Sequence, residues 1–346
     1  MTALVSRARG RLRRSILRLQ RRISTPGRFS LSLTQTLNLL YPQPIPEELG
    51  LDDLALAVNG SLRVKDLHAV RKILSALDGP SAPSPVHVRF GAADITTADL
   101  NGVTVVLDRA DLSVSREVLA GRGYEPEVTA VLESVLNEGM TFVDIGANIG
   151  IHTVLGSRLV GTSGRVFAVE PYSENCRMIL MAMAENQLEN ITLLPVALDD
   201  HRGWSHLATN IGSNASLVSD EADQIARGYG TIVPSFRLDD LVEGPIDVVK
   251  VDVEGAEGRV MAGAGGLLAK WRPIVITEAS QEMLQRVSKV SLKEYVEGFT
   301  RQGYAMSLLD RNGGPPQEID DVEDFLAQWT DLVRVENLLL RPEEKP

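Results

Sequence analysis

The sequence lacks several features that define common classes of protein. It holds a single cysteine, Cys176, which precludes a framework of intrachain disulfides. It has no apolar run of 18 residues and is dense in arginine near its start, so we expect neither a transmembrane helix nor a secretory signal peptide. Internal repeats and long low-complexity tracts are also absent, which argues against a solenoid or a collagen-like chain.

Charge is distributed unevenly along the chain. The net charge is -11, yet residues 1–46 hold nine arginines and no acid, which leaves 26 basic against 46 acidic residues in the remainder. Apolar residues recur at helical spacing among these arginines as far as Pro26, a pattern that predicts a basic amphipathic helix. Such a helix either lies on an anionic membrane surface or forms a solvated or self-docking tail.

The length and composition allow one large domain or two modest ones. Hydrophobic residues make up 44% of the 346 residues, enough for a substantial core. The proline-rich segment 80–85 reads as a linker, and residues 86–90 and 103–107 read as strands with an Asn101-Gly102 turn between them. We expect a basic amphipathic tail over residues 1–28, a helical and β cap region over 29–120, and a catalytic domain over 121–346.

The most informative segment is 141–150, which reads Thr-Phe-Val-Asp-Ile-Gly-Ala-Asn-Ile-Gly. Residues 143–145 are typical of the end of a buried parallel strand, and residues 149–159 have the apolar spacing of a helix. The two glycines therefore lie in a turn between a strand and a helix, where open α/β sheets bind ligands. Asp144 supplies a hydrogen-bond acceptor beside that turn.

A second acid, Glu170, follows the next apolar run, about 20 residues after the first strand. A carboxylate at this position can accept both hydroxyls of a ribose, which NAD and S-adenosylmethionine both carry. A dinucleotide also needs a glycine-rich turn for its pyrophosphate, and here no third glycine completes G-x-G-x-x-G. Because nearby acids stabilise a sulfonium, Asp144 and the short glycine pattern favour S-adenosylmethionine.

Four segments, taken in order, resemble the FkbM family of methyltransferases. They are Phe142–Gly150; Val169–Pro171; Val196–Asp199 with Asn210–Leu217; and Phe236–Leu241 leading to Lys250–Glu257. A lone Asp-x-Gly-x-x-x-Gly motif is a weak signal, but its appearance with the other segments at βα spacing is specific. The family uses S-adenosylmethionine and mostly methylates hydroxyl oxygens of sugars and polyketide products.

The resemblance implies a set of residues for the cofactor site. The set is Asp144, Gly146, Ala147, Asn148, Gly150, Glu170, Pro171, Ala197 and Leu198. Within it, the segment 144–150 would face the amino acid end of the cofactor, Glu170 would face the ribose, and Ala197 and Leu198 would flank the adenine.

Seven apolar runs predict the strands of one sheet, and helical patterns separate the first five. The runs are residues 142–145, 166–169, 191–194, 246–253, 273–277, 304–309 and 333–340. This alternation predicts a doubly wound, mainly parallel α/β sheet. The resemblance implies a seven-stranded, Rossmann-like methyltransferase sheet in the order 3-2-1-4-5-7-6, with an N-terminal helical and small β extension.

Carboxylates after the fourth and fifth strands are the candidates for catalysis. Methyl transfer to a hydroxyl requires alignment of the reactants and removal of a proton, and Asp252, Glu254 and Glu278 could accept it, with Asp252 the leading candidate. On an extended strand Asp252 and Glu254 would share one face and could hold a divalent metal or a shared proton. Alternatively, Asp252 and Glu254 cap the following helix, because the dipole of a helix favours acids near its start. The metal ligands, if a metal binds, stay unknown.

The sequence therefore predicts a cytoplasmic O-methyltransferase that moves a methyl group from S-adenosylmethionine to a hydroxyl of a sugar, glycolipid or related secondary metabolite. The polar segment 210–219 is predicted to form a loop of the acceptor cleft. Residues 1–26 are a candidate contact with the inner membrane surface, and divalent metal dependence stays open. A nucleic-acid substrate is not expected, because the core is acidic and no Asn/Asp-Pro-Pro-Tyr/Phe motif is present.

Two alternatives remain open on the sequence. The first is a Rossmann oxidoreductase that binds NAD through the same turn and Glu170. The second is a non-catalytic cofactor-binding module recruited to membranes by the basic tail.

Overall fold

The computed structural model describes residues 95–109, 111, 113–211, 214–217, 231–327, 329 and 334–343. Three predicted segments lie outside these residues: the basic tail, the linker at 80–85 and the strand at 86–90. The membrane role of residues 1–26 therefore stays a prediction. A comparison of vesicle binding between the full chain and a chain that lacks residues 1–26 would test it. Within the described part, no helix combines the length and apolar character needed to cross a membrane.

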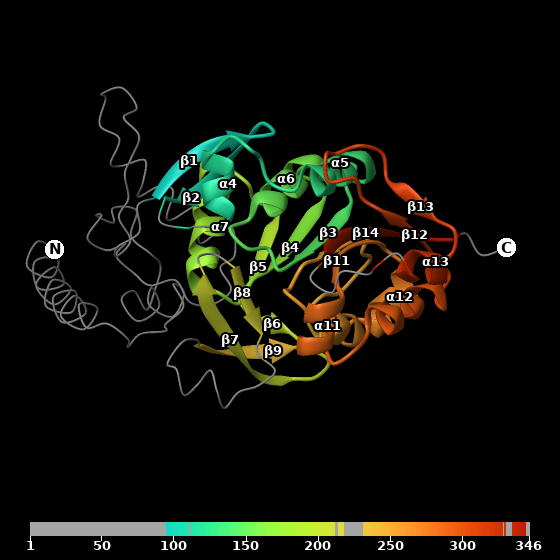
Figure 1. The fold of residues 1–346 in the computed structure, drawn as a ribbon. Coiled ribbons are helices and arrows are strands. Elements are labelled where there is room, and N and C mark those ends of the chain that lie inside the picture. The colour runs from blue at the N-terminus through green and yellow to red at the C-terminus, as the bar shows by residue number, and fades with distance from the viewer. Residues whose placement is uncertain are drawn as a thin grey trace, which may run out of the picture. The chain divides into compact units, whose positions relative to one another are not determined.

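An eight-stranded mixed sheet lies at the centre of the described part (Figure 1). In spatial order its strands are β13 (Gln317–Ile319), β12 (Tyr304–Leu308), β14 (Val335–Pro342), β11 (Ile274–Ser280), β10 (Val248–Val251), β3 (Thr141–Ile145), β4 (Arg165–Val169) and β5 (Ile191–Leu194). The run from β11 to β5 is parallel, whereas β14 is antiparallel to both β11 and β12. The carboxyl ends of the five parallel strands therefore meet at one edge.

All seven predicted strands are present, with ends that differ by a few residues. The predicted count of seven is nevertheless wrong, because β13 pairs with β12 and adds an eighth strand at the edge. Without β13, the strands lie in the order 3-2-1-4-5-7-6 by position along the chain. The three residues of β13 are too short for a hydrophobic period to show, so sequence reasoning missed this strand.

Helices cover both faces of the sheet (Figure 1). They are α4 (Val114–Leu119), α5 (Pro126–Val135), α6 (Ile151–Val160), α7 (Ser173–Glu185), the short 3-10 helix η2 (Leu238–Asp240), α9 (Glu257–Ala262), α10 (Gly265–Trp271), α11 (Gln281–Val287), α12 (Leu292–Thr300) and α13 (Val322–Ala327). This arrangement is the α/β architecture that the alternation of strand and helix patterns predicted.

The side chains of β3 divide between the two faces because successive residues of a strand point in opposite directions. Phe142 and Asp144 face α6: a Cβ on Gly156 of α6 would meet the Phe142 ring, and Thr153 of α6 donates to Asp144. Val143 and Ile145 belong instead to the large core cluster that includes side chains of α9, α11 and α12. An acid is therefore placed on the α6 face of an otherwise apolar strand.

A second, four-stranded sheet holds β6 (Ala197–Leu198), β9 (Thr231–Phe236), β7 (Gly203–Ile211) and β8 (Asn214–Leu217), in that spatial order. Its presence corrects the prediction of a loop over residues 210–219, because residues 214–217 form β8 and pair with β7. The polar composition of this segment concealed the strand, since its Asn and Ser residues are depleted in strands on average.

The described part of the cap region begins with a hairpin of β1 (Ile95–Leu100) and β2 (Val103–Asp108). The Asn101-Gly102 turn is correct, and it joins β2 to β1. Asn101 and Gly102 have φ angles of 53° and 74°, as a two-residue hairpin turn requires. The hairpin shares a hydrophobic cluster with α6 and α7, and the domain boundary at residue 120 stays a prediction.

We predict that Gly156→Ala destabilises the protein, because a Cβ there would lie 2.5 Å from Cδ1 of the fully buried Phe142 ring. Overpacking of this kind costs about 1–3 kcal/mol and outweighs the gain in helix propensity of about 1 kcal/mol. Denaturant unfolding measures the difference. The matched control is Gly298→Ala in α12, where a Cβ meets no atom within 4 Å and the variant should be as stable as wild type or more stable. Equal stability of Gly156→Ala and wild type would contradict the packing of α6 on β3.

Candidate active site

The turn after β3 is fixed by hydrogen bonds to β4. The amides of Gly146 and Ala147 both donate to the carbonyl oxygen of Val169 at 3.0 Å. Gly146 has a φ of 75°, and a Cβ on it would lie 1.7 Å from the carbonyl oxygen of Asp252. The glycine is thus required because the chain leaving β10 passes directly against the turn. The predicted cofactor turn and the predicted catalytic segment are in contact.

Gly150 has a different environment. Its φ is 90°, and a Cβ on it would lie 2.8 Å from Cγ1 of Ile179 in α7. The absence of a side chain at Gly150 therefore allows α6 and α7 to pack closely. Its predicted contact with the cofactor stays a prediction, and the packing alone explains the glycine.

Asp144 presents a buried acceptor without a partner. It is 1% exposed; its Oδ2 accepts a hydrogen bond from Thr153 Oγ1 at 2.5 Å, while its Oδ1 has no partner among the described residues. Burial raises the pKa of Asp144 above its ordinary value, an effect that the charge of Lys250 opposes. An unsatisfied buried acceptor costs about 1–3 kcal/mol, so a donor from a ligand would stabilise the site. The ammonium of S-adenosylmethionine suits this position chemically.

Glu170 holds the turn and keeps capacity to accept further hydrogen bonds. Its Oε2 accepts from the amide of Asn148 at 2.9 Å, and its Oε1 accepts from the amide of Tyr172 at 2.8 Å. Burial raises the pKa of Glu170 to about 8, against the opposing effect of these hydrogen bonds. The Asn175 side chain donates a third hydrogen bond to Glu170. Two carboxylate oxygens offer about four acceptor positions, so one hydroxyl of a ribose can still be accommodated. The residues present thus fit S-adenosylmethionine at both ends.

The remaining predicted cofactor residues lie at two places. Pro171 follows Glu170 and is half-buried. Ala197 and Leu198 form β6, pair with β9 and are each 3% exposed, and the Leu198 side chain belongs to the large core cluster. Asp199 anchors this strand, because Arg259 Nε donates to its Oδ1 at 2.9 Å. The proposed contact of Ala197 and Leu198 with adenine stays a prediction.

Cys176 of α7 is a free and buried thiol. Its Sγ donates to the carbonyl oxygen of Glu170 at 3.0 Å, and burial raises its pKa well above the ordinary value. A thiol in this state is a poor nucleophile. We therefore assign it no chemistry.

Lys250 is the charged residue at the centre of the site. It lies in β10 in register with Asp144 of β3, is 4% exposed, and its Nζ is 3.0 Å from Asp252 Oδ2. Burial by itself would lower the pKa of Lys250, but the carboxylates of Asp252, Glu125 and Asp144 outweigh burial and raise it. The ammonium therefore stays charged and neutralises part of the surrounding acid.

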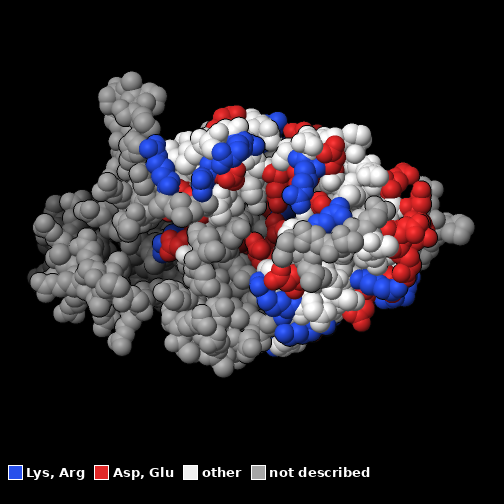
Figure 2. Space-filling view, in the orientation of Figure 1, with Lys and Arg blue, Asp and Glu red and all other residues white. Residues whose placement is uncertain are grey.

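The carboxylates around Lys250 have unusual proton affinities. Burial raises the pKa of Glu254 to about 7, and Asp252 adds to the rise. Burial also raises the pKa of Glu278 well above its ordinary value, as do Asp252, Glu257 and Glu254. Glu254 therefore gains or loses a proton near neutral pH, as proton acceptors in catalysis do. Figure 2 shows acidic side chains gathered in the middle of the face, between the regions that Figure 1 labels α6 and α11.

The geometry assumed for Asp252 and Glu254 is wrong. Both residues lie beyond the end of β10 at Val251, and Glu254 has a φ of 55°, so they do not share one face of an extended strand. The turn is held by Glu257, whose Oε1 accepts from the amides of Val253 and Gly255 at 3.0 and 3.1 Å. Glu257 thus holds the loop before α9, and the capping role considered for Asp252 and Glu254 is wrong, because no side-chain hydrogen bond caps this helix at its N-cap residue Ala256.

Sequence reasoning missed two residues that the structure brings to this cluster. Glu125 precedes α5 with a φ of 40°, a strained backbone for this residue type, and its Oε2 lies 3.5 Å from His152 Nδ1. Tyr124 lies close enough to Glu125, Asp252 and Glu278 for their charges to raise the pKa of its hydroxyl, after the larger effect of burial. No motif surrounds these two residues, and the unusual backbone of Glu125 cannot be read from the sequence.

His152 of α6 is a buried wall residue of the site. It is 3% exposed, and its ring centroid lies 5.6 Å from that of Tyr124. Burial lowers the pKa of His152 well below its ordinary value, so the imidazole is neutral.

The structure gives little support to a metal at the predicted acids. A metal held by side chains alone needs at least three His, Cys or carboxylate ligands close together. Among the described residues, Asp252 and Glu254 do not belong to such a group, whereas Asp199, Asp200 and His201 form one. Asp199 in that group is already paired with Arg259. The divalent metal stays a prediction without assigned ligands.

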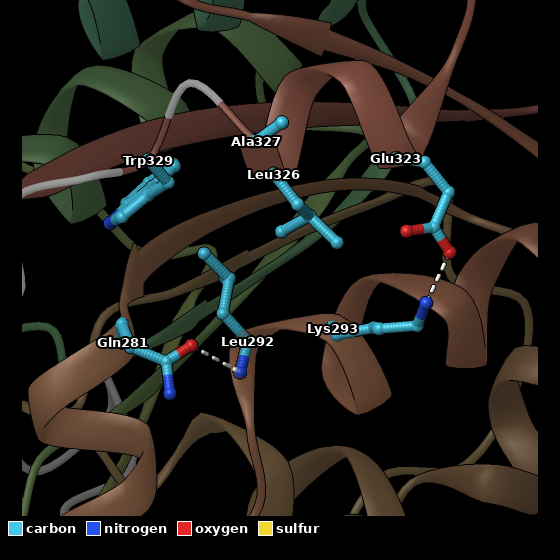
Figure 3. Close-up of a pocket in the computed structure, with 7 residues that line it drawn as sticks. All are labelled: Gln281, Leu292, Lys293, Glu323, Leu326, Ala327 and Trp329. Carbon is cyan, nitrogen blue, oxygen red and sulfur yellow. Dashed lines mark hydrogen bonds and ion pairs between the residues drawn. The ribbon is translucent and has the colours of Figure 1, made fainter.

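A separate hollow of about 320 Å³ lies between α11, α12 and α13 (Figure 3). Lys293 and Glu323 form an ion pair across it, and Gln281 Oε1 accepts from the amide of Leu292 at 3.1 Å. None of the predicted cofactor or catalytic residues lines this hollow. It is therefore not part of the candidate site.

The fold and the site together define an α/β protein with a ligand site at the carboxyl ends of parallel strands. The family described as Methyltransferase FkbM domain matches residues 144–331, more than half of the chain, and the protein belongs to this family. This membership favours a methyltransferase over an NAD-binding oxidoreductase. A comparison with curated proteins found no match.

Three solved structures are among those to which the chain is similar. The methyltransferase FkbM from Methylobacillus flagellatus is 14% identical, with a TM-score of 0.38, over 65% of this chain and 59% of its own. An rRNA methylase from Streptococcus thermophilus is 12% identical, with a TM-score of 0.38, over 63% and 95%. Aeropyrum pernix fibrillarin with S-adenosyl-L-methionine is 12% identical, with a TM-score of 0.36, over 71% and 96%.

We predict that Glu125→Gln flattens the dependence of stability on pH. Burial raises the pKa of folded Glu125 to about 8, so its contribution to stability is complete below the unfolded pKa of about 4.3 and is lost as pH rises toward 8. The ligand-free wild-type protein should lose free energy of unfolding when the pH is raised from 5 to 8. In Glu125→Gln this loss should be smaller by roughly 1–3 kcal/mol. Denaturant titrations at both pH values measure this.

The matched control is Glu133→Gln, an exposed position on the same helix that should keep the wild-type dependence. If Glu125→Gln and wild type lose the same stability over this range, Glu125 is not buried with a raised pKa.

Proposed function

We propose that the protein transfers a methyl group from S-adenosylmethionine to a hydroxyl of a sugar, a glycolipid or a related secondary metabolite. Family membership supports methyl transfer. The observation that carries the proposal is the contact between the Gly146 turn and the backbone of Asp252, which brings the candidate cofactor turn against carboxylates able to accept a proton.

The residues that would hold the donor are Asp144, Asn148 and Glu170. Asp144 Oδ1 is an unpaired acceptor for the ammonium of the methionine part, and Glu170 has acceptor capacity left for the ribose. When bound, S-adenosylmethionine supplies an electrophilic methyl group on a positively charged sulfur. The surrounding carboxylates favour that positive charge.

The protein's own task is to accept the proton of the acceptor hydroxyl. Glu254 suits this task best of the three predicted catalytic acids, because it is half-buried and burial raises its pKa to about 7. Asp252 is engaged with Lys250 at 3.0 Å and lies beside the turn, so it would orient the acceptor. Glu278 at the end of β11 faces the same group of acids and would contribute a hydrogen bond to the acceptor.

The charge of the site supports a neutral or cationic acceptor. Asp252 and, once ionised for its role as proton acceptor, Glu254 oppose the close approach of phosphate groups, because the Lys250 ammonium neutralises only part of their charge. A polyhydroxylated acceptor meets no such repulsion and can form hydrogen bonds with carboxylates. A nucleic-acid substrate is therefore disfavoured. Separately, we propose that the protein acts in the cytoplasm.

We predict that Glu254→Gln lowers kcat by about 10²–10⁴-fold, because the amide cannot accept the proton. The assay follows release of S-adenosylhomocysteine with a panel of monosaccharides, methyl glycosides and glycolipids. In the wild-type enzyme kcat/KM should rise as pH increases through about 7 and then level off, since Glu254 must be ionised to act.

The matched control is Glu282→Gln, an exposed glutamate of α11 with an ion pair to Arg286, which should keep wild-type kcat. Wild-type kcat in Glu254→Gln would remove this residue from the mechanism. Methylation of none of the hydroxyl acceptors, together with methylation of a nitrogen or carbon acceptor, would overturn O-methylation itself.

A further inference from the structure

Lys250 is an unusual residue for the middle of a central strand. It lies in β10 between β3 and β11, is 4% exposed, and its ammonium is 3.0 Å from Asp252 Oδ2. Removing an ammonium from water costs several kcal/mol unless opposite charge surrounds it. Hydrophobic residues fill the rest of β10, so a lysine at this position needs a reason beyond packing.

The groups around the Lys250 ammonium come from four elements. Asp144 of β3 is its register neighbour, and Asp252 and Glu254 follow β10 itself. Glu125 precedes α5, and His152 of α6 is buried and neutral. The ammonium is thus surrounded mainly by carboxylates, and its charge favours their ionised form.

Asp144 is one of the carboxyl groups that the Lys250 charge favours in the ionised form. It is 1% exposed, and its protein partners are Thr153 Oγ1 and the field of Lys250, while Oδ1 has no partner. Without a positive charge nearby, a carboxyl group buried to this degree takes up a proton. A protonated Asp144 has lost the negative charge that attracts a cationic ligand.

We propose that Lys250 is a positioning residue for the methyl donor, whose ammonium keeps Asp144 as a carboxylate so that the site presents negative charge to the sulfonium and ammonium of S-adenosylmethionine. This inference rests on the proposed function. Lys250 would thus act on the donor through Asp144. The same arrangement explains why a costly buried charge occupies the strand.

The test is calorimetric titration of the full chain with S-adenosylmethionine at pH 6.5 and pH 8.5. In Lys250→Met, affinity should be about tenfold weaker than wild type at pH 6.5, since a larger fraction of Asp144 is then protonated. The difference should shrink to within about threefold at pH 8.5, because the ionised fraction of Asp144 increases with pH. The ratio of variant to wild type cancels titration of the ligand's own amino group. Lys250→Arg, which keeps the charge, should restore affinity at pH 6.5.

A second variant guards against loss of folding. The double variant Lys250→Met with Asp252→Asn removes both members of the ion pair, so neither charge is left buried without its partner. In this variant Asp144 still lacks the positive charge of Lys250. The double variant should therefore show the same recovery of affinity with pH. Lys293→Met, an exposed lysine near the separate hollow, is the control and should bind as wild type does at both pH values.

A loss of affinity that is the same at pH 6.5 and pH 8.5 would overturn the inference, because a purely structural role predicts no recovery. Wild-type affinity in Lys250→Met at pH 6.5 would overturn it as well. S-adenosylhomocysteine, which lacks the sulfonium charge, should lose less affinity than S-adenosylmethionine. Failure of the proposed function is seen separately, since wild type would then bind neither ligand.

Discussion

The close contact between the turn after β3 and the chain leaving β10 is the constraint on which the site depends. A Cβ at Gly146 would lie 1.7 Å from the Asp252 carbonyl oxygen, so only glycine allows the two segments to meet. The parallel register of β3 and β10 sets up this contact, because both strands end at the same level. A turn suited to a donor and a segment rich in proton acceptors therefore share one edge of the sheet.

Electrostatics gives this edge its chemical character. One buried ammonium, Lys250, lies among carboxylates from three separate segments, and burial raises the pKa of several of those carboxyls. A region with excess negative charge suits a cationic donor and a neutral acceptor. The same charges destabilise the ligand-free protein as pH rises, which is a cost that functional sites often carry.

Much of the fold follows from the sequence because strands and helices alternate with clear periods. The parallel strands are marked by apolar runs such as 142–145 and 166–169, and the turn at Gly146 by its glycine spacing. The small sheet of β6 to β9 could not be predicted, since its polar residues 214–217 resemble a loop. Strand β13 was missed because three residues cannot show a period.

The candidate site was predictable only where motifs carry it. Asp144 stands out as an acid near the end of a buried strand, and Glu170 and Asp252 as acids that follow buried strands. Tyr124 and Glu125, in contrast, reach the cluster through a strained residue before α5. Lys250 lies within a recognisable segment, but its burial among acids depends on neighbouring strands. Contacts between distant segments fix such environments, and a sequence pattern does not show them.

The most direct test of the account is calorimetric titration of the full chain and of Asp144→Asn with S-adenosylmethionine, S-adenosylhomocysteine and NAD. The account predicts that wild type binds the first two and not NAD, and that Asp144→Asn weakens S-adenosylmethionine binding by about tenfold or more. Binding of NAD alone, or S-adenosylmethionine binding that is unchanged in Asp144→Asn, would contradict it.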